Sequence, residues 1–289
     1  MTRKAACSGG VSDPTAGCKP ARSESMLSYV IRKLLARIEP GKRNTTARFD
    51  PRDSDVFIVS YPRSGSTWVR FLLANLTRYD SQDPVDFHSV QRVIPDIMQR
   101  AGREMLQAVP SPRLLKSHHR YDSRLKKVIY VLRDGRDVMV SYYYLLVGQG
   151  GFEGSFLEFL NKEDLKPCLW HEHVESWLLR DDQDGLLLIR YEDLHRQTEI
   201  EVARMARFVG LPCDKARLDW SVSNSCFEIM QRMEAERGRA FYADRPFLAV
   251  RKGTIGDWGN HFGAAHKNVF KRYSNRALLQ FGYVENENW

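Results

Sequence analysis

A short polar turn follows the apolar run Val56–Val59 and leads into a segment with helical spacing. The turn reads Arg63-Ser64-Gly65-Ser66-Thr67, so it combines a cation, hydroxyl side chains and a glycine. Backbone N–H groups that converge around a glycine, together with the positive end of a following helix, bind a phosphate or a sulfate. A turn in which Ser and Thr only cap the helix would use the same residue types. The turn alone therefore leaves both interpretations open.

The turn differs from a standard P-loop, whose pattern GxxxxGK[ST] places a lysine after the second glycine. Here Ser66 follows Gly65, and the cation Arg63 precedes that glycine by two residues. A nucleotide kinase would need the lysine and also a carboxylate that holds Mg²⁺. The sequence therefore argues against a kinase, which we keep as the alternative function.

A second candidate for chemistry lies in RLLKSHH (Arg113–His119). Lys116 and His118 are two residues apart, so an extended strand places them on one face and turns His119 the opposite way. Imidazole titrates near neutrality, so His118 could take the proton of an acceptor hydroxyl. A lone histidine at a strand end is more often structural, but the neighbouring Lys116 favours catalysis.

Cations with the chemistry of a phosphate site occur in two later stretches, VIYVLRDGRDVMVSYYY (Val128–Tyr144) and RKGTIGDWGNHF (Arg251–Phe262). Arginine forks and lysine point charges near glycine amides are the groups that hold a phosphate. A solvated surface pair is the alternative for Arg251 and Lys252. Their position before two glycines and a tryptophan favours a binding loop.

Taken in order, these four stretches resemble the cytosolic sulfotransferase family, which transfers a sulfuryl group from phosphoadenosine phosphosulfate (PAPS) and releases the adenosine bisphosphate PAP. The resemblance runs from about Val56 to about Phe262, and LIRYEDL (Leu188–Leu194) and SCFEIM (Ser225–Met230) add weaker matches. Its most specific parts are RKGxxGDW and the R-x7-S spacing of Arg133 and Ser141. It implies a fold similar to that of P-loop NTPases and transfer to a hydroxyl group of a small-molecule or lipid-like acceptor.

The resemblance also assigns roles to residues. The turn Arg63–Thr67 would hold the 5′-phosphosulfate, Arg133, Ser141 and the Arg251–Gly253 run would grip the 3′-phosphate, and aromatic residues would orient the adenine. The catalytic set is His118 as base with Lys116 and Arg63. The cofactor-binding set is Arg63, Ser64, Gly65, Ser66, Thr67, Trp68, Arg133, Ser141, Tyr191, Ser225, Phe227, Arg251, Lys252 and Gly253. Core packing is the alternative for Trp68 and Phe227.

Three points qualify the resemblance. Arg63 stands where the better-known members carry lysine, which leaves charge stabilisation intact but not ready proton donation. Gly259, Gly263-Ala264 and Asn268 replace the family's short dimer motif, so we expect either a monomer or a dimer of another kind. We expect no metal, since His171 and His173, two apart on a helix, diverge by roughly 200°.

The composition is basic, which favours an anionic partner: nucleic acid, a membrane surface or a phosphorylated small molecule. Its 289 residues include 44 Lys and Arg against 36 Asp and Glu, a formal charge of +8. This excess also fits a non-enzymatic binder of nucleic acid or membrane, but such a surface needs aromatics interleaved with the basic residues, which here lie in glycine-bearing loops. We therefore expect no nucleic-acid partner. Scattered cysteines and the lack of a long apolar run predict a cytoplasmic protein without stable membrane insertion.

Short apolar strands alternating with helices must position these residues. This order predicts an α/β fold with one central parallel sheet covered by helices on both faces. We expect a disordered tail over 1–25, an amphipathic helix over 27–38 docked on the core, and a single domain over 26–289. A helix that lies on a membrane surface is the alternative for 27–38. The predicted strands are Val56–Ser60, Arg113–Ser117, Val128–Leu132 and Leu186–Arg190, and the predicted helices Thr67–Arg78, Asp134–Leu146, Leu169–Arg180 and Glu199–Val209.

Overall fold

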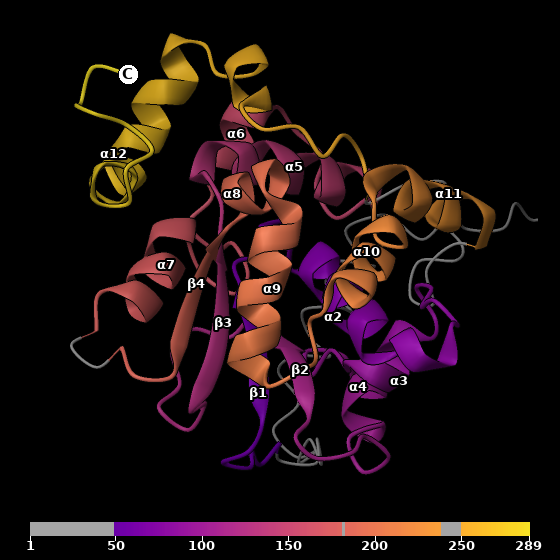
Figure 1. Cartoon of the computed structure of the whole chain (residues 1–289). Coiled ribbons are helices and arrows are strands. Elements are labelled where there is room, and N and C mark those ends of the chain that lie inside the picture. Colours follow the sequence, from indigo (N-terminus) through magenta and orange to yellow (C-terminus); the bar gives the residue numbers. More distant parts are fainter. Residues whose placement is uncertain (1–48, 181–182, 238–249) are drawn as a thin grey trace, which may run out of the picture. The chain divides into compact units, whose positions relative to one another are not determined.

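The computed structural model describes residues 49–180, 183–237 and 250–289 (Figure 1). These residues belong to one compact unit. The tail predicted at 1–25 and the helix predicted at 27–38 lie outside the described residues, so both, with the domain boundary at residue 26, stay predictions. Along the described ranges, no helix combines the length and the apolar character that crossing a bilayer requires.

The described elements alternate between strands and helices in the first two thirds of the chain and are helical afterwards. In chain order they are β1 (Val56–Ser60), α2 (Ser66–Thr77), η1 (Tyr79–Ser81), α3 (Val90–Val93), α4 (Arg100–Glu104), β2 (Leu114–Ser117), β3 (Lys127–Leu132), α5 (Gly135–Gly148), α6 (Phe156–Leu160), α7 (Trp170–Leu178), β4 (Leu186–Arg190), α8 (Tyr191–Arg196), α9 (Thr198–Val209), α10 (Lys215–Ser223), α11 (Phe227–Arg237), η2 (Asp257–Asn260) and α12 (Ala264–Gln280).

The four predicted strands form one parallel sheet in the order β2-β1-β3-β4. Ile58 on β1 lies opposite Lys116 on β2 and Ile129 on β3, and Val131 lies opposite Ile189 on β4. The predicted parallel sheet is confirmed. The predicted helices also form, although α5 runs on to Gly148 and α7 ends at Leu178.

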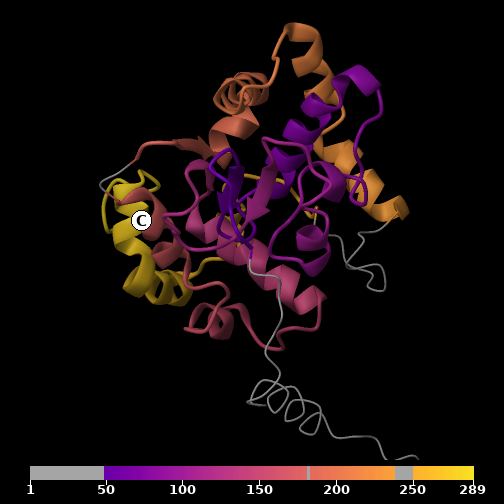
Figure 2. The same ribbon diagram turned by 90° about the horizontal axis from the view of Figure 1, so that it is seen from below.

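Alternate residues of the strands feed two separate hydrophobic clusters. Phe57 and Val59 pack with α5, α6, α7 and α12 on one face, whereas Val56 and Ile58 pack with α2, α9 and α10 on the other. Figure 2 shows this layering along the strands, with the yellow α12 on one side of the sheet and the orange α9 and α10 on the other. Because helices cover both faces of the sheet, every residue of β1 is buried. This burial explains why the β1 sequence is apolar without alternating polar residues.

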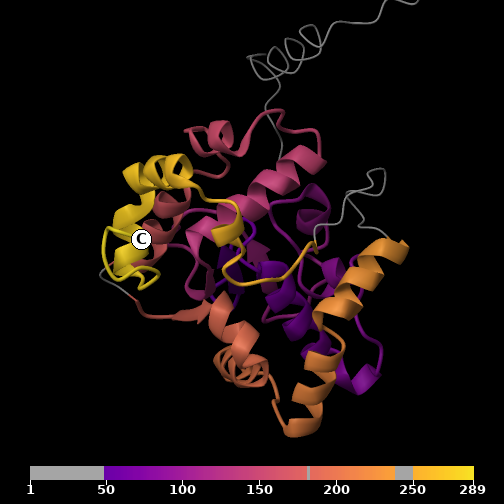
Figure 3. The ribbon, with the colours of Figure 1, turned by 90° about the horizontal axis from the view of Figure 1, so that it is seen from above.

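Residues 250–256, which we call the flap, cross the carboxyl-terminal edge of the sheet (Figures 1 and 3). The carboxylate of Asp137, in the first turn of α5, accepts hydrogen bonds from the backbone N–H of Gly256 at 2.8 Å and of Trp258 at 2.9 Å. This carboxylate fixes the end of the flap above the strands.

Candidate active site

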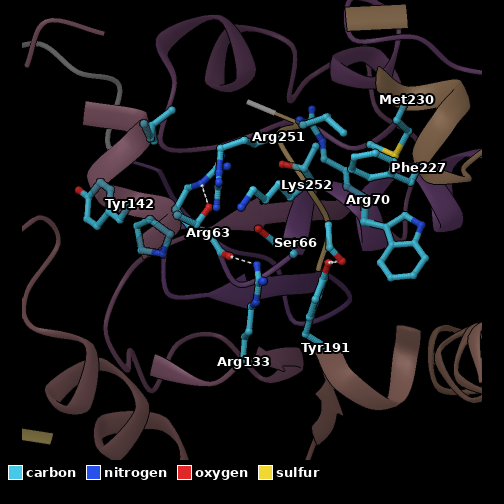
Figure 4. A pocket seen from close by; sticks show the side chains of 18 of the residues that line it. Arg63, Ser66, Arg70, Arg133, Tyr142, Tyr191, Phe227, Met230, Arg251 and Lys252 are labelled. Carbon is cyan, nitrogen blue, oxygen red and sulfur yellow. Dashed lines mark hydrogen bonds between the residues drawn. The ribbon is translucent and has the colours of Figure 1, made fainter. Parts of the chain in front are cut away.

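A cavity of about 670 Å³ opens at the carboxyl ends of the strands. In open parallel sheets this edge is where ligands bind. Nearly all residues predicted for the site line this cavity, and Figure 4 shows several of their side chains converging on it. The predicted residues in its wall are Arg63, Gly65, Ser66, Thr67, Trp68, Lys116, His118, Arg133, Ser141, Tyr191, Phe227, Arg251, Lys252 and Gly253.

Ser64 and Ser225 are the predicted residues that the structure does not bring into the cavity wall. Both are buried, at 1% and 0% exposure. The hydroxyl of Ser225 instead accepts a hydrogen bond from Asn75 Nδ2 at 3.0 Å, inside the packing of α2. Their roles toward a cofactor stay predictions.

The turn between β1 and α2 has the backbone of an anion cradle. Arg63 has φ +73° and Gly65 has φ +99°, both in the left-handed region, and such turns gather N–H groups into a concave nest. A Cβ added at Gly65 would lie 2.5 Å from Cδ2 of Tyr191. Position 65 therefore requires glycine for two reasons: the left-handed backbone conformation and the Tyr191 ring packed against it.

Two side chains join this turn to the flap, which lies about 190 residues later in the sequence. Tyr191, packed on Gly65, donates its hydroxyl proton to the carbonyl oxygen of Gly253 at 3.0 Å. Arg133 lies over the Tyr191 ring, 4.2 Å from its centre, and donates to the carbonyls of Arg63 at 3.3 Å and Thr254 at 2.9 Å. The turn and the flap therefore form two walls of one cavity.

The cations of the flap are held by an internal carboxylate. Arg251 and Lys252 donate to Asp257 at 3.1 Å and 2.9 Å. Burial acts to raise the pKa of Asp257, but hydrogen bonds from Lys252, Asn260 and Arg251 outweigh it and hold that pKa well below its usual range. Asp257 is therefore ionised at neutral pH and keeps both cations on the cavity side of the flap.

One end of the cavity is aromatic. Trp68 contacts Tyr191 and His195 edge to face, with ring centres 6.0 Å and 6.1 Å apart. The Phe227 ring packs over Gly253, where an added Cβ would lie 2.8 Å from its Cδ2. Trp68 lines the cavity and also packs against the hydrophobic cluster of α2, α9 and α10, whereas Phe71 in the next turn of α2 is fully buried. Flat rings with polar edges suit a planar heteroaromatic ligand.

The backbone of β1 sets the protonation of His118. Nδ1 of His118 lies 2.7 Å from the carbonyl oxygen of Ser60. A carbonyl can only accept, so Nδ1 carries the proton and the lone pair remains on Nε2. Burial, followed by the charge of Lys116, lowers the pKa of His118 to about 3. The imidazole is thus neutral at physiological pH, with Nε2 unprotonated. His119 lies outside the cavity wall and is exposed.

A buried pair behind His118 fixes the main chain that carries it. Nε2 of His173 lies 3.2 Å from the carbonyl oxygen of His118, and Nδ1 of His173 lies 2.9 Å from the hydroxyl of Tyr130. The carbonyl requires a proton on Nε2, so Tyr130 donates to Nδ1. Burial lowers the pKa of His173 to about 4, and this neutral form is the one that the two bonds need. Across residues 49–180, 183–237 and 250–289, no group of three His, Cys, Asp or Glu side chains is placed to hold a metal ion.

Several residues that line the cavity were not predicted from the sequence. Asp96 and Met98 reach the cavity from the loop before α4, and His195 reaches it from α8. Asp137 follows Arg133 by four residues on the helical side of the RDGRD run, and this spacing could have marked it. Asp96 has no such marker, because only the folded chain places it beside Lys116.

Comparison with known proteins identifies the family of this chain. Residues 53–282 match the family model described as the sulfotransferase domain. The chain belongs to the sulfotransferase family. This confirms the resemblance, and the comparisons lend no support to a nucleotide-dependent kinase.

Relatives in the sulfotransferase family cover most of the chain. Human sulfotransferase 4A1 is 30% identical over 263 residues, which are 84% of this chain and 88% of the human protein. Rat sulfotransferase 2A1 is 27% identical over 254 residues, which are 83% of this chain and 89% of the rat protein.

Solved sulfotransferase structures share the fold. Mouse sulfotransferase SULT7A1, complexed with PAP, has a TM-score of 0.60 and 22% identity over 81% of this chain and 90% of its own. Retinol dehydratase, in a complex with retinol and PAP, has a TM-score of 0.62 and 22% identity over 79% of this chain and 82% of its own. The α/β architecture with a central parallel sheet is thus that of the family.

Proposed function

We propose that this sulfotransferase moves the sulfuryl group of PAPS to a hydroxyl group of a small-molecule acceptor, with His118 as general base and PAP as the second product. The observation that carries the proposal is the joining of the turn and the flap by Arg133 and Tyr191 around one cavity. The solved relatives complexed with PAP support the choice of nucleotide.

The cavity wall fits a doubly anionic nucleotide. Two of its buried donors, Nε of Arg133 and Nε1 of Trp68, have no hydrogen-bond partner among the described residues. Buried polar atoms are nearly always paired, so two unpaired donors in residues of one cavity wall are unusual. Gly65 and Gly253 let the rings of Tyr191 and Phe227 pack directly on the backbone at two places in the wall of the same cavity.

The residues divide by charge and shape into three groups toward PAPS. The turn Arg63–Thr67 would receive the 5′-phosphosulfate at the start of α2. Arg133, Ser141 and the Arg251–Gly253 run would receive the 3′-phosphate. The rings of Trp68, Tyr191 and Phe227 would flank the adenine, and Ser64 and Ser225 would support these contacts from outside the wall.

When bound, PAPS supplies the electrophilic sulfur and a phosphate leaving group. Nε2 of His118 takes the proton of the acceptor hydroxyl, because Ser60 holds the ring proton on Nδ1. Arg63 and Lys116 present positive charge where negative charge develops, and one such donor is typically worth ~3 kcal/mol. Arg63 donates from Nε to the hydroxyl of Ser141 at 3.0 Å, so its guanidinium is held at the turn.

The remaining wall of the cavity suits the body of an organic acceptor. Phe87, Met98, Tyr142, Leu145 and Leu146 line it with apolar surface. These residues come from the loop before α3, the loop before α4 and the last turns of α5. A cytoplasmic location and the absence of a nucleic-acid partner remain predictions, as does a monomer or a dimer without the usual motif.

The proposal is tested by transfer of radiolabel from PAPS to a panel of phenols, alcohols and lipid-linked hydroxyl compounds, with nucleotide binding measured alongside. PAP should raise the melting temperature, and ATP with Mg²⁺ should not. Label transfer to at least one acceptor is expected. Stabilisation by ATP and Mg²⁺ but not by PAP would reject the proposal.

A further inference from the structure

A buried carboxylate, Asp96, lies against the catalytic lysine. The segment before α4 runs beside β2: Lys116 N–H donates to the carbonyl of Pro95 at 2.8 Å, and Ile97 N–H donates to the carbonyl of Lys116 at 3.0 Å. This parallel bridge pairs Asp96 with Lys116. The ammonium of Lys116 lies 2.6 Å from Oδ2 of Asp96, and both side chains are buried, at 8% and 4% exposure.

The position of Asp96 is fixed from several directions. Its backbone N–H donates to Oε1 of Gln91 at 3.0 Å, and the same oxygen accepts from Arg70 on α2 at 2.7 Å. Its second carboxylate oxygen, Oδ1, accepts from Met98 N–H at 3.0 Å. Gly102 on α4 packs so closely that a Cβ there would lie 2.1 Å from the carbonyl oxygen of Asp96. A carboxylate held in this way is a rigid anchor.

The pair borders the cavity next to the proposed base. Asp96, Lys116 and His118 all line the cavity. Burial raises the pKa of Asp96, but the charges of Lys116 and His118, a hydrogen bond from Lys116 and the charge of Arg70 together lower it below its usual value. Asp96 is therefore ionised at neutral pH, and the groups that face the pair are His118 after β2 and Arg70 on α2.

A lysine on a four-carbon stem does not hold its ammonium in one place unaided, because the side chain loses much rotamer entropy when it is ordered. The bond to Oδ2 of Asp96 restricts that freedom and uses one N–H, while the ammonium still borders the cavity. An anchor of this kind serves a cation that must stand at one point in the transition state.

We propose that Asp96 is a positioning residue of the sulfuryl transfer, which holds the ammonium of Lys116 at the reaction centre and keeps it protonated. The inference rests on the proposed function. Asp96 touches neither reactant: the acceptor proton goes to His118, Lys116 keeps its three protons, and Asp96 stays a carboxylate throughout. The effect of Asp96 must therefore pass through Lys116.

The test is a double-mutant cycle on the full chain with Asp96→Asn, Lys116→Met and both together, using PAPS and the best acceptor of the panel. Asp96→Asn alone should lower kcat by at least about tenfold, since misplacement of a catalytic group by about 1 Å can cost on the order of 100-fold. It should leave the Kd for PAP within about threefold. In the Lys116→Met background, Asp96→Asn should change kcat by less than about twofold, because there is no ammonium left to hold.

The rate–pH profile separates positioning from a structural role. In Asp96→Asn the alkaline fall in kcat should begin at lower pH, because a buried ammonium without its carboxylate gives up its proton more readily. Asp96→Glu, which keeps the charge, should restore the alkaline limb at least in part. Asp83→Asn, a neutralisation at an exposed carboxylate before α3, should leave rate and profile unchanged.

Equal losses from Asp96→Asn in both backgrounds, or a kcat within twofold of the parent, would overturn the inference. If the single variant does not fold, Lys116→Met is compared with the double variant, in which the buried carboxylate has been removed with its partner. A double variant whose kcat is a further tenfold below that of Lys116→Met would also overturn the inference. A parent enzyme that transfers label and loses transfer in His118→Ala keeps the proposed function intact whichever result Asp96 gives, whereas a parent that transfers no label removes both.

Discussion

The hydroxyl of Tyr191 donates a hydrogen bond to the carbonyl oxygen of Gly253 across 3.0 Å, while the same ring covers Gly65. One side chain thus contacts both the turn after β1 and the flap before α12. Neither segment encloses the cavity alone, because each contributes its glycine backbone and its cations to only one wall. Tyr191 and Arg133 make them a single surface.

Gly65→Ala should weaken the binding of PAP by at least about tenfold. A Cβ at this position would be strained by about 1 kcal/mol in the left-handed region and would push the Tyr191 ring off the turn. Gly210→Ala is the matched control, because Gly210 also has a positive φ, at the end of α9, but its added Cβ would meet no atom within 4 Å. Isothermal titration with PAP should show a loss for Gly65→Ala only. Equal losses for the two variants would mean that strain, not the Tyr191 contact, is responsible.

Arg133→Ala should weaken PAP about 10- to 100-fold, the size expected for a lost hydrogen bond to a charged group. The affinity for adenosine 5′-monophosphate, which lacks the 3′-phosphate, should fall much less. Arg124→Ala removes an exposed arginine and controls for the change in net charge. If Arg133→Ala weakens both nucleotides to the same extent, Arg133 joins the turn and flap but does not read the 3′-phosphate.

His118→Ala should lower kcat by about 10²- to 10⁴-fold, the range for a positioned general base. The Kd for PAP should remain within about threefold of the parent, since the proposed function assigns His118 to the acceptor and not to the phosphate groups. His119→Ala, one residue further and outside the cavity wall, should retain the parent kcat. Turnover by His118→Ala at the parent rate would show that another group accepts the proton.

Acid pH should destabilise the protein through two imidazoles, His118 and His173, whose pKa values are strongly lowered on folding. The pKa of His118 falls from 6.5 to about 3 on folding, and that of His173 from 6.5 to about 4. Between pH 6.5 and 4 the unfolded chain therefore binds protons that the folded chain does not, so the free energy of unfolding falls as the pH is lowered.

His173→Gln tests that contribution, because its amide can keep the donor to the His118 carbonyl and the acceptor for Tyr130 without titrating. Denaturant unfolding between pH 7 and pH 5 should show a pH slope that is shallower than the parent slope by up to about 1.4 kcal/mol per pH unit. Parallel slopes would mean that His173 is not buried in its neutral form.

The sheet could be predicted from the sequence because its strands are apolar on both faces. Val56–Ser60 and Leu186–Arg190 form with the predicted bounds. The turn and flap could be identified because glycines and cations stand at spacings that the family resemblance supplies. Helix ends were less certain: α5 runs two residues past its predicted end at Leu146, to Gly148.

The rest of the site depends on contacts that no local pattern shows. Asp96 reaches Lys116 through a single bridge between segments twenty residues apart, and Ser60 selects the His118 tautomer through a main-chain carbonyl. Ser225 shows the reverse case, in which a motif residue is turned into the packing of α2. Such pairings follow from tertiary packing rather than from spacing along the chain.

Hydrogen–deuterium exchange with and without saturating PAP tests the central claim most directly. If the turn and the flap enclose the nucleotide together, peptides that cover 61–68 and 250–258 should both become protected, and Gly65→Ala should reduce the protection of both. Protection of one segment without the other, or of neither while PAP is bound, would contradict the account.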